Sequence, residues 1–164
     1  MKRSQLKTFP LHELATIVRG SSPRPARDRD LFNGNYLPWI TVAEITKDTG
    51  MYLVSTATKL TEKGAKQTRI LEPGTLLLTN SGATLGVPKI TRIRAGANDG
   101  VAALLDIRGC SVEFLFYALQ AKTRYFREIL APGVGQPNLN TELIGGTRIE
   151  LPSIEEQHKI GEIL

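Results

Sequence analysis

The sequence is poor in the residues that build disulfides and metal sites. Its 164 residues include one cysteine, Cys110, and two histidines, His12 and His158. A single cysteine excludes an internal disulfide and every zinc site built from paired cysteines, and it is typical of a reducing compartment. We therefore expect no metal site, and we expect both histidines to be structural or exposed.

Long apolar runs are missing as well. No window approaches the stretch of about 18 apolar residues that marks a transmembrane helix, and the charged start MKRSQLKTFP leads into no apolar signal segment. The sequence therefore predicts a cytoplasmic protein without membrane contact. With 41% hydrophobic and 23% charged residues, the chain has enough apolar side chains to bury a core of its own.

Motifs that would give the chain a chemistry of its own are also absent. The segment LLLTNSGATLGV at 76–87 has two glycines after an apolar run, but it has neither G-K-[ST] nor G-x-G-x-x-G for nucleotide binding. No D/N-P-P-Y/F loop marks a base-amine methyltransferase. Glu44 and Lys47 lack the spacing and the upstream carboxylate of a metal-dependent nuclease, and no serine or cysteine has a defensible histidine base. We expect no catalytic residue.

Positive charge is what the sequence has in excess. It holds 21 Lys and Arg against 16 Asp and Glu, a formal net charge of +5. Residues 1–149 hold 20 basic and 12 acidic side chains and so carry +8, whereas residues 150–164 hold one and four and carry −3. A polyanion is the natural partner of such a basic body.

The basic residues gather in three stretches that read as loops or turns. These stretches lie at 19–29, 59–69 and 89–94, and they hold Arg19, Arg24, Arg27, Arg29, Lys59, Lys63, Lys66, Arg69, Lys89, Arg92 and Arg94. Arginine grips phosphate as a planar fork and also pairs with guanine O6 and N7, so the first stretch suits contact with nucleic acid. The alternative is a solvated loop in which Asp28 and Asp30 partly neutralise Arg27 and Arg29.

The pattern of apolar residues predicts a mixed α/β domain with a strand-rich body. A short amphipathic segment at 9–18 comes first. Strands are expected at 36–45, 51–60, 75–79, 87–93 and 100–107. Trp39 is expected to pack in the core rather than stack on a base. Apolar residues recur every three or four positions at 112–130, which predicts a long packed helix with Ser111 as its N-cap.

The last residues predict the start of another helix. Ser153 and Glu156 form an S-x-x-E capping box, so we divide the chain into a body at 1–150 and a helix start at 151–164. The helix has too few turns to be stable alone and therefore needs a partner or a continuation. Its apolar face is made of Ile160, Ile163 and Leu164.

Four short motifs stand out along the chain. They are PWI at 38–40, P-G-T-L-L-L-T-x-S-G-A-x-x-G at 73–86, QPNLN at 136–140 and LPSIEEQHKI at 151–160. Together they resemble the target-recognition domain of a type I restriction-modification specificity subunit. The resemblance covers essentially the whole chain, and it implies a DNA target-recognition domain at 1–150 followed by the start of the spacer helix. The implied activity is sequence-specific recognition of double-stranded DNA without catalysis.

The resemblance also implies partners and cofactors. In that family a modification subunit binds S-adenosylmethionine and methylates adenine, and a restriction subunit cleaves DNA, so this chain itself is expected to bind no cofactor. With one recognition domain and the first turns of a spacer, it is expected to act as a half-subunit that can form a homodimer through its terminal helix. The alternatives are a protein-interaction module that docks on a modification subunit without touching DNA, and a small metal-dependent nuclease.

The candidate DNA contacts come from the basic stretches and from the turn after a buried strand. They are Arg24, Arg27, Arg29, Lys63, Lys66, Gln67, Arg69, Asn80, Ser81, Lys89 and Arg92. Contacts to phosphates would set the register, and a few side chains would read base edges in the major groove. Gln136 and Asn138 are expected instead to hold the loop that joins the domain to the terminal helix.

Overall fold

Two strands that are buried on both faces lie at the centre of the fold. They are β7 (Leu76–Thr79) and β10 (Val101–Leu105), which pair antiparallel in a computed structural model that describes residues 6–131, 135 and 137–163. They belong to a five-stranded sheet of order β2-β10-β7-β8-β4, whose other members are β2 (Thr16–Arg19), β8 (Pro88–Thr91) and β4 (Tyr52–Leu53). The strands predicted at 75–79 and 100–107 are confirmed, because continuous apolar runs are typical of strands covered on both faces.

Each central strand sends alternate side chains into two separate cores. Leu76 and Leu78 face a core that contains the helices, whereas Leu77 faces a core shared with a second sheet. This alternation follows from the two-residue period of a strand. The second sheet has the order β5-β3-β9-β6, with β5 (Lys59–Leu60), β3 (Leu37–Ile40), β9 (Ala95–Ala97) and β6 (Ile70–Leu71).

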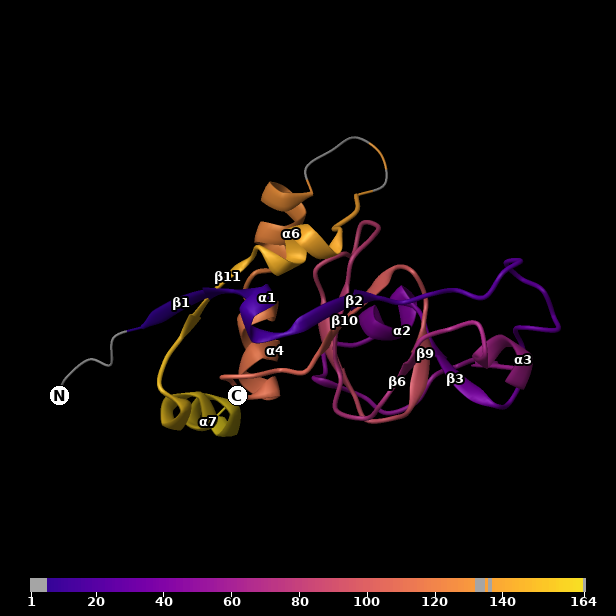
Figure 1. Ribbon diagram of the computed structural model, residues 1–164, viewed down its shortest axis with the longest axis horizontal. Coiled ribbons are helices and arrows are strands. Elements are labelled where there is room, and N and C mark those ends of the chain that lie inside the picture. Colours follow the sequence, from indigo (N-terminus) through magenta and orange to yellow (C-terminus); the bar gives the residue numbers. More distant parts are fainter. Residues whose placement is uncertain (1–5, 132–134, 136, 164) are drawn as a thin grey trace.

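A third, smaller cluster lies at the end of the second sheet, beneath α3 (Glu62–Ala65). Trp39 packs there with Leu37 and Leu60, and its ring meets the Phe32 ring edge to face at 6.0 Å. The expectation that Trp39 packs in the core is confirmed. In Figure 1, α3 lies at one end of the molecule, far from the terminal helix α7 (Ile154–Ile163).

Three elements predicted within the first 60 residues differ from the structure. The segment at 9–18 divides into the end of β1 (Lys7–Pro10), the short helix α1 (Leu11–Leu14) and β2. The strand predicted at 36–45 ends at Ile40, because the Thr41 hydroxyl accepts a hydrogen bond from the Glu44 N–H at 3.4 Å and begins helix α2 (Val42–Thr46). Of the strand predicted at 51–60, only β4 and β5 at its two ends are regular.

The long helix predicted at 112–130 is broken into three pieces. Ser111 caps α4 (Val112–Gln120) as expected, and α5 (Thr123–Tyr125) and the π-helix η1 (Phe126–Leu130) follow after a bend. The side chains beyond the bend bond the loop between β7 and β8: Thr123 Oγ1 donates to Gly86 O at 2.7 Å and Arg127 Nε to Leu85 O at 2.8 Å. These tertiary bonds accompany a change of direction that helical periodicity cannot predict.

The chain then returns through α6 (Thr141–Gly145) and β11 (Arg148–Leu151) to α7. Strand β11 pairs antiparallel with β1, which places the first described strand beside the strand that leads into α7 (Figure 1). The predicted capping box is confirmed, because Ser153 Oγ accepts from the Glu156 N–H at 3.3 Å and Glu156 Oε2 accepts from the Ser153 N–H at 3.1 Å. The division into a body and a spacer helix stays a prediction.

Helix α7 is attached to the body through Gln157, which is only 2% exposed. Its Oε1 accepts from the Ser111 N–H at 3.1 Å, and its Nε2 donates to Pro152 O at 3.1 Å. Ile160 packs against the helical core, so the expectation that it faces a partner helix is corrected. Ile163 is 81% exposed, and Leu164 lies outside the described residues.

We expect Gln157→Ala to lower the free energy of unfolding by about 1–3 kcal/mol, because the Ser111 N–H at the start of α4 loses its partner. Chemical denaturation of the purified chain measures this loss. His158→Ala, at the exposed neighbouring position on the same helix, is the matched control and should be close to neutral. Equal losses for the two variants would contradict a structural role for Gln157.

Candidate nucleic-acid interface

The loop after β2 is tied to the turn before β10 by Asp99. The Asp99 carboxylate accepts hydrogen bonds from the Ser22 N–H at 3.0 Å and from Arg24 Nη2 at 3.1 Å. Its backbone oxygen accepts from Arg19 Nε at 2.7 Å, and its N–H donates to Ser22 Oγ at 3.3 Å. Arg19 and Arg24 are thereby bound to one turn, and the Arg24 side chain remains 71% exposed.

The same loop also contacts the second basic stretch. The Arg24 N–H donates to Gln67 Oε1 at 3.0 Å, Thr68 Oγ1 donates to Ser21 O at 2.7 Å, and the Arg69 N–H donates to Ser21 Oγ at 3.0 Å. These bonds join segments that are more than 40 residues apart in the sequence. The structure therefore brings two of the three predicted basic stretches together.

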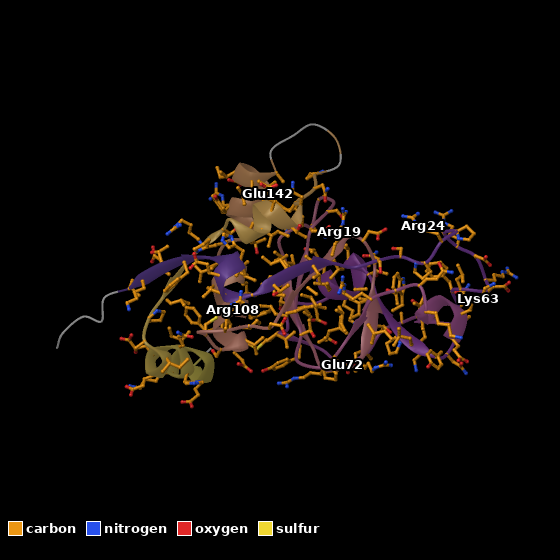
Figure 2. The ribbon with its side chains drawn as sticks, in the orientation of Figure 1. Arg19, Arg24, Lys63, Glu72, Arg108 and Glu142 are labelled. Carbon is orange, nitrogen blue, oxygen red and sulfur yellow. The ribbon has the colours of Figure 1, made fainter. Side chains whose placement is uncertain are left out.

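We call the resulting surface the basic edge. It consists of Arg19, Arg24, Arg27, Arg29, Lys63, Lys66, Gln67 and Arg69, all of them exposed. Figure 2 shows the labelled Arg19, Arg24 and Lys63 on the same side of the molecule, away from α7. Within the described part of the chain, no hydrogen bond or ion pair involves the side chains of Arg27, Arg29 or Lys66, so their charges are free to meet a ligand.

The acidic residues of the first loop have partners other than those expected. Asp30 lies 3.9 Å from Lys63 Nζ, and Asp28 Oδ1 accepts from the Asp30 N–H at 2.9 Å. Among the described residues, neither carboxylate forms an ion pair with Arg27 or Arg29. Direct neutralisation of these two arginines, which the sequence left open, is therefore not seen.

The turn after β7 lies next to the basic edge. A Cβ atom added at Gly100 would come within 2.8 Å of Ser81 Oγ, which places Ser81 beside the Asp99 turn. Asn80 precedes it but is only 1% exposed, and its Oδ1 has no hydrogen-bond partner among the described residues. Ser81 thus stays a candidate contact, whereas Asn80 is corrected to a buried position, because its backbone bonds on both sides hold it inside the turn.

The QPNLN motif holds the chain before α6 against this turn. The Leu139 N–H donates to Asn80 O at 2.7 Å, and Asn138 forms an isolated antiparallel bridge with Ser81. Asn140 Oδ1 then caps α6 by accepting from the Leu143 N–H at 2.7 Å. The structural role expected of Asn138 agrees with this pairing, although the loop it holds lies before α6 rather than before α7. Gln136 lies outside the described residues.

Lys89 is not available to a ligand, which corrects its prediction as a DNA contact. Its side chain is 1% exposed, and its ammonium donates to the Asp48 carboxylate and, at 3.3 Å, to Asp48 O. The hydrogen bond from Lys89 lowers the pKa of Asp48 below its usual value. The sequence alternation at 87–93 suggested one exposed face, but β8 is buried along its whole length, and a buried charge requires a partner.

Arg92 is exposed but does not join the basic edge. It follows β8 at the sheet end where Gly74 donates to Thr91 O, whereas Ser81 follows the opposite end of β7. Its guanidinium lies 3.9 Å from the centre of the Tyr52 ring, a cation–π contact. The third basic stretch therefore belongs to another part of the surface, and Arg92 stays a predicted DNA contact that lies outside the basic edge.

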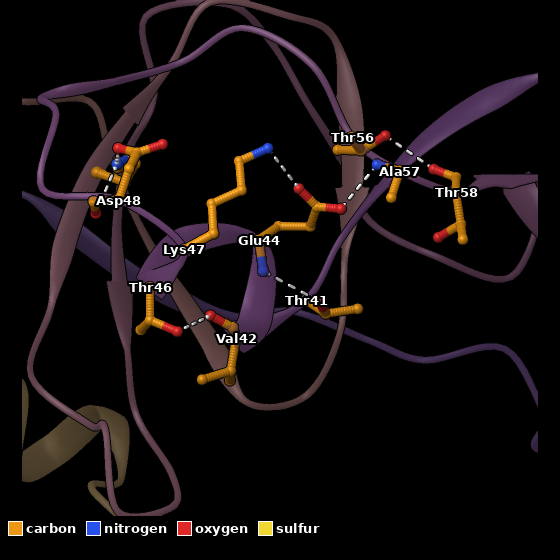
Figure 3. A network of polar contacts seen from close by, with 10 residues as sticks. Thr41, Val42, Glu44, Thr46, Lys47, Asp48, Thr56, Ala57 and Thr58 are labelled. Carbon is orange, nitrogen blue, oxygen red and sulfur yellow. Dashed lines mark hydrogen bonds and ion pairs between the residues drawn. The ribbon is translucent and has the colours of Figure 1, made fainter.

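The carboxylate considered for nuclease chemistry has a structural role (Figure 3). Glu44 Oε1 accepts from the Ala57 N–H at 2.7 Å, and Glu44 Oε2 accepts from Lys47 Nζ at 2.9 Å. Burial raises the pKa of Glu44, but the bonds from Ala57 and Lys47 outweigh it, so the pKa is lower than usual. These bonds tie α2 to the segment before β5, and they leave the carboxylate ionised and already paired.

The cysteine and the two histidines likewise show no sign of catalytic activation. Burial raises the pKa of the Cys110 thiol to about 11, which disfavours the reactive thiolate. His12 Nδ1 lies 3.0 Å from Gly145 O, and His158 is exposed. Within residues 6–131, 135 and 137–163, no three His, Cys, Asp or Glu side chains lie close enough to hold a metal ion, and none of the helices has the length and apolar character to cross a bilayer.

Comparison with known proteins identifies the family. A family model described as the type I restriction modification DNA specificity domain matches residues 3–164. The chain belongs to this family. The specificity subunit of the type I restriction enzyme MjaIX from Methanocaldococcus jannaschii is 29% identical over 158 residues, which are 94% of this chain and 36% of that protein. The chain thus spans about a third of the length of this curated relative.

Solved structures of specificity subunits share the fold of this domain. The HsdS subunit from Thermoanaerobacter tengcongensis superposes with a TM-score of 0.71 at 21% identity and covers 96% of this chain and 36% of that one. The S subunit from M. genitalium gives a TM-score of 0.71 at 13% identity over 99% and 39% of the two chains. A chain from a structure on complex assembly and conformational transition of the type I R-M system gives 0.75 at 21% identity over 96% and 37%.

The sequence did not predict three residues of this region, namely Arg19 of the basic edge and the pair Ser22 and Asp99 that supports it. Arg19 was counted in the first basic stretch but not chosen as a contact, and Ser22 and Asp99 were not considered. Arg19 carried a usable signal, because it directly precedes the irregular loop. Asp99 carried none, since its bonds to Ser22 and Arg24 span 77 and 75 residues.

The lowered pKa of Asp48 predicts a pH dependence of stability. A carboxyl whose pKa is lower in the folded state stabilises the fold above its unfolded pKa, about 3.9, and this stabilisation is lost as the pH falls through the folded value. We therefore expect Asp48→Asn to be less stable than the parent at pH 7, with the difference narrowing below about pH 4. Urea denaturation across this range measures it.

The matched control for this pH series is Glu150→Gln, an exposed carboxylate on β11. It should follow the parent curve at every pH. A constant difference between Asp48→Asn and the parent down to the acid limit would show that the Lys89–Asp48 pair does not depend on the charge of Asp48.

Proposed function

We propose that this chain is a DNA-reading module of a type I restriction-modification specificity subunit and that it binds double-stranded DNA through the basic edge. One observation carries the proposal: two basic stretches, distant in sequence, are held together by the bond of Arg24 to Gln67 and by the bonds of Ser21 to Thr68 and Arg69. They leave Arg27, Arg29 and Lys66 exposed without a protein partner in the described chain. Free cations beside an ordered arginine suit both phosphate contact and base reading.

In this proposal the chain selects DNA and performs no chemistry. Adenine methylation with S-adenosylmethionine would belong to a partner modification subunit, and cleavage to a restriction subunit, both directed by the sequence that this chain recognises. The structural bonds of Glu44 and the raised pKa of Cys110 support a non-catalytic role. The cytoplasmic location expected from the sequence stays a prediction.

Assembly would use the opposite end of the molecule from α3. Helix α7 is fixed to α4 by Gln157, and Ile163 on its far turn is 81% exposed. The curated relative is almost three times as long as this chain, and a second recognition domain or a second copy of this chain would supply part of the remaining length. A homodimer through α7 is therefore proposed, with Ile163 as its described apolar contact.

The test of DNA binding is its dependence on salt. We expect the logarithm of the affinity for a random duplex to fall linearly with the logarithm of salt concentration, with a slope of about −0.9 for each neutralised phosphate. Arg27→Ala and Arg29→Ala should each weaken binding to all duplexes and make this slope shallower by about one. Gel-shift titration at several salt concentrations, with melting temperature followed in parallel, measures both effects.

Arg124→Ala supplies the control for these variants. Arg124 is exposed, pairs with Glu128 at 2.9 Å and lies on α5, outside the basic edge. Its removal should leave both slope and affinity nearly unchanged. Absent or salt-independent DNA binding by the parent would overturn the proposal in favour of a protein-interaction module that docks on a modification subunit.

A further inference from the structure

We propose that Asp99 is a specificity-determining positioning residue, which orients Arg24 so that its guanidinium reads a base edge rather than serving only as a phosphate contact. The inference rests on the proposed function and names one residue pair within the basic edge. The position of the Asp99 carboxylate calls for an explanation. A carboxylate that is 41% exposed stands among cations proposed to meet a polyanion, where its charge opposes binding.

Arg24 is held at both of its ends. Its backbone N–H donates to Gln67 Oε1 at 3.0 Å, and its Nη2 donates to Asp99 Oδ2 at 3.1 Å. A guanidinium has five N–H donors. In the described structure Asp99 is the only group that bonds the Arg24 side chain, so most of its donors still face solvent and can form a two-bond contact to guanine O6 and N7.

The support behind Asp99 is rigid. The Asp99 N–H and carboxylate both bond Ser22, and a Cβ atom at Gly20 would lie 2.2 Å from Asn98 O, so the loop backbone runs directly against the turn. The Gly20 N–H also donates to Val101 O, on the central strand β10, at 2.8 Å. The loop and the turn that hold Arg24 are thereby both attached to the start of the buried strand β10.

Three other cations of the edge lack such support. Arg27, Arg29 and Lys66 have no side-chain partner among the described residues, which suits contact with phosphates, whose positions carry no sequence information. An ordered side chain loses less conformational entropy when it binds and enforces one geometry on its partner. Arg19 is also bonded to this turn, but through the backbone oxygen of Asp99, so Arg24 is the cation that the Asp99 carboxylate orients. The contrast between this side chain and the three unbound cations separates base reading from phosphate contact within the same surface.

The test uses Asp99→Asn in the full 164-residue chain and a library of random double-stranded DNA from which bound duplexes are selected and sequenced. The parent should enrich one base at a defined position. We expect Asp99→Asn to lose that preference by about 5- to 100-fold, the discrimination of one two-bond contact, while its affinity for unselected duplex is equal or higher because a negative charge is gone. The amide oxygen can still accept from the Ser22 N–H, so the fold should persist.

Arg24→Lys provides a second route that does not disturb Asp99's neighbours. Lysine keeps the charge but lacks the planar fork, so the same base preference should vanish while binding to unselected duplex remains. The double variant should lose no more than either single one, which marks the two residues as one unit. Arg29→Ala, the control, should weaken binding to every duplex and leave the base preference intact.

The outcomes separate the two levels of the proposal. If the parent binds DNA with the expected salt dependence but has no base preference, or if either variant keeps it, only the role of Asp99 is overturned. A lower melting temperature with uniformly weaker binding for Asp99→Asn would assign the residue to the fold instead. Failure of the parent to bind any duplex would overturn the DNA interface and, with it, this inference.

Discussion

The burial of β7 and β10 on both faces is the constraint on which the rest of the structure depends. Two strands with a core on either side have no exposed position, so their side chains must be apolar or fully bonded. Thr79 shows the rule, because its hydroxyl donates to Thr84 O and accepts from the Val87 N–H. Exposed polar and charged groups therefore lie beyond the ends of these strands. There, the turn at Asn98–Asp99 supports the loop after β2, which contributes part of the basic edge.

The four motifs that mark the family belong to this scaffold. Trp39 packs beneath α3, Leu139 is buried beside the turn after β7, and Gln157 bonds α7 to the body. None of these side chains lies on the basic edge. Family membership therefore identifies the frame, whereas the residues of the basic edge come from loops outside the motifs, and this division is compatible with a shared fold at 21% identity.

The sequence predicted the structure well where the bonded residues are close in sequence, and poorly where they are distant. The N-cap at Ser111 and the capping box at Ser153 were predicted correctly, because in each the two partners lie three residues apart. The bend after α4 was not, because Thr123 and Arg127 bond a loop some 40 residues away. Lys89 was misplaced for a related reason: alternation indicates that one face differs from the other, but it cannot show that both are covered.

By itself, the sequence determined the strand-rich mixed fold, the ends of its capped helices, the family and the two basic stretches, since these depend on residue types and on spacings of a few positions. Only the tertiary structure decided which cations share a surface. It joined the first two stretches through Gln67 and Ser21, bonded Arg24 to Asp99, buried Lys89 against Asp48 and left Arg92 on another edge. The physical reason is that each of these bonds joins residues that only the paired sheets bring within reach.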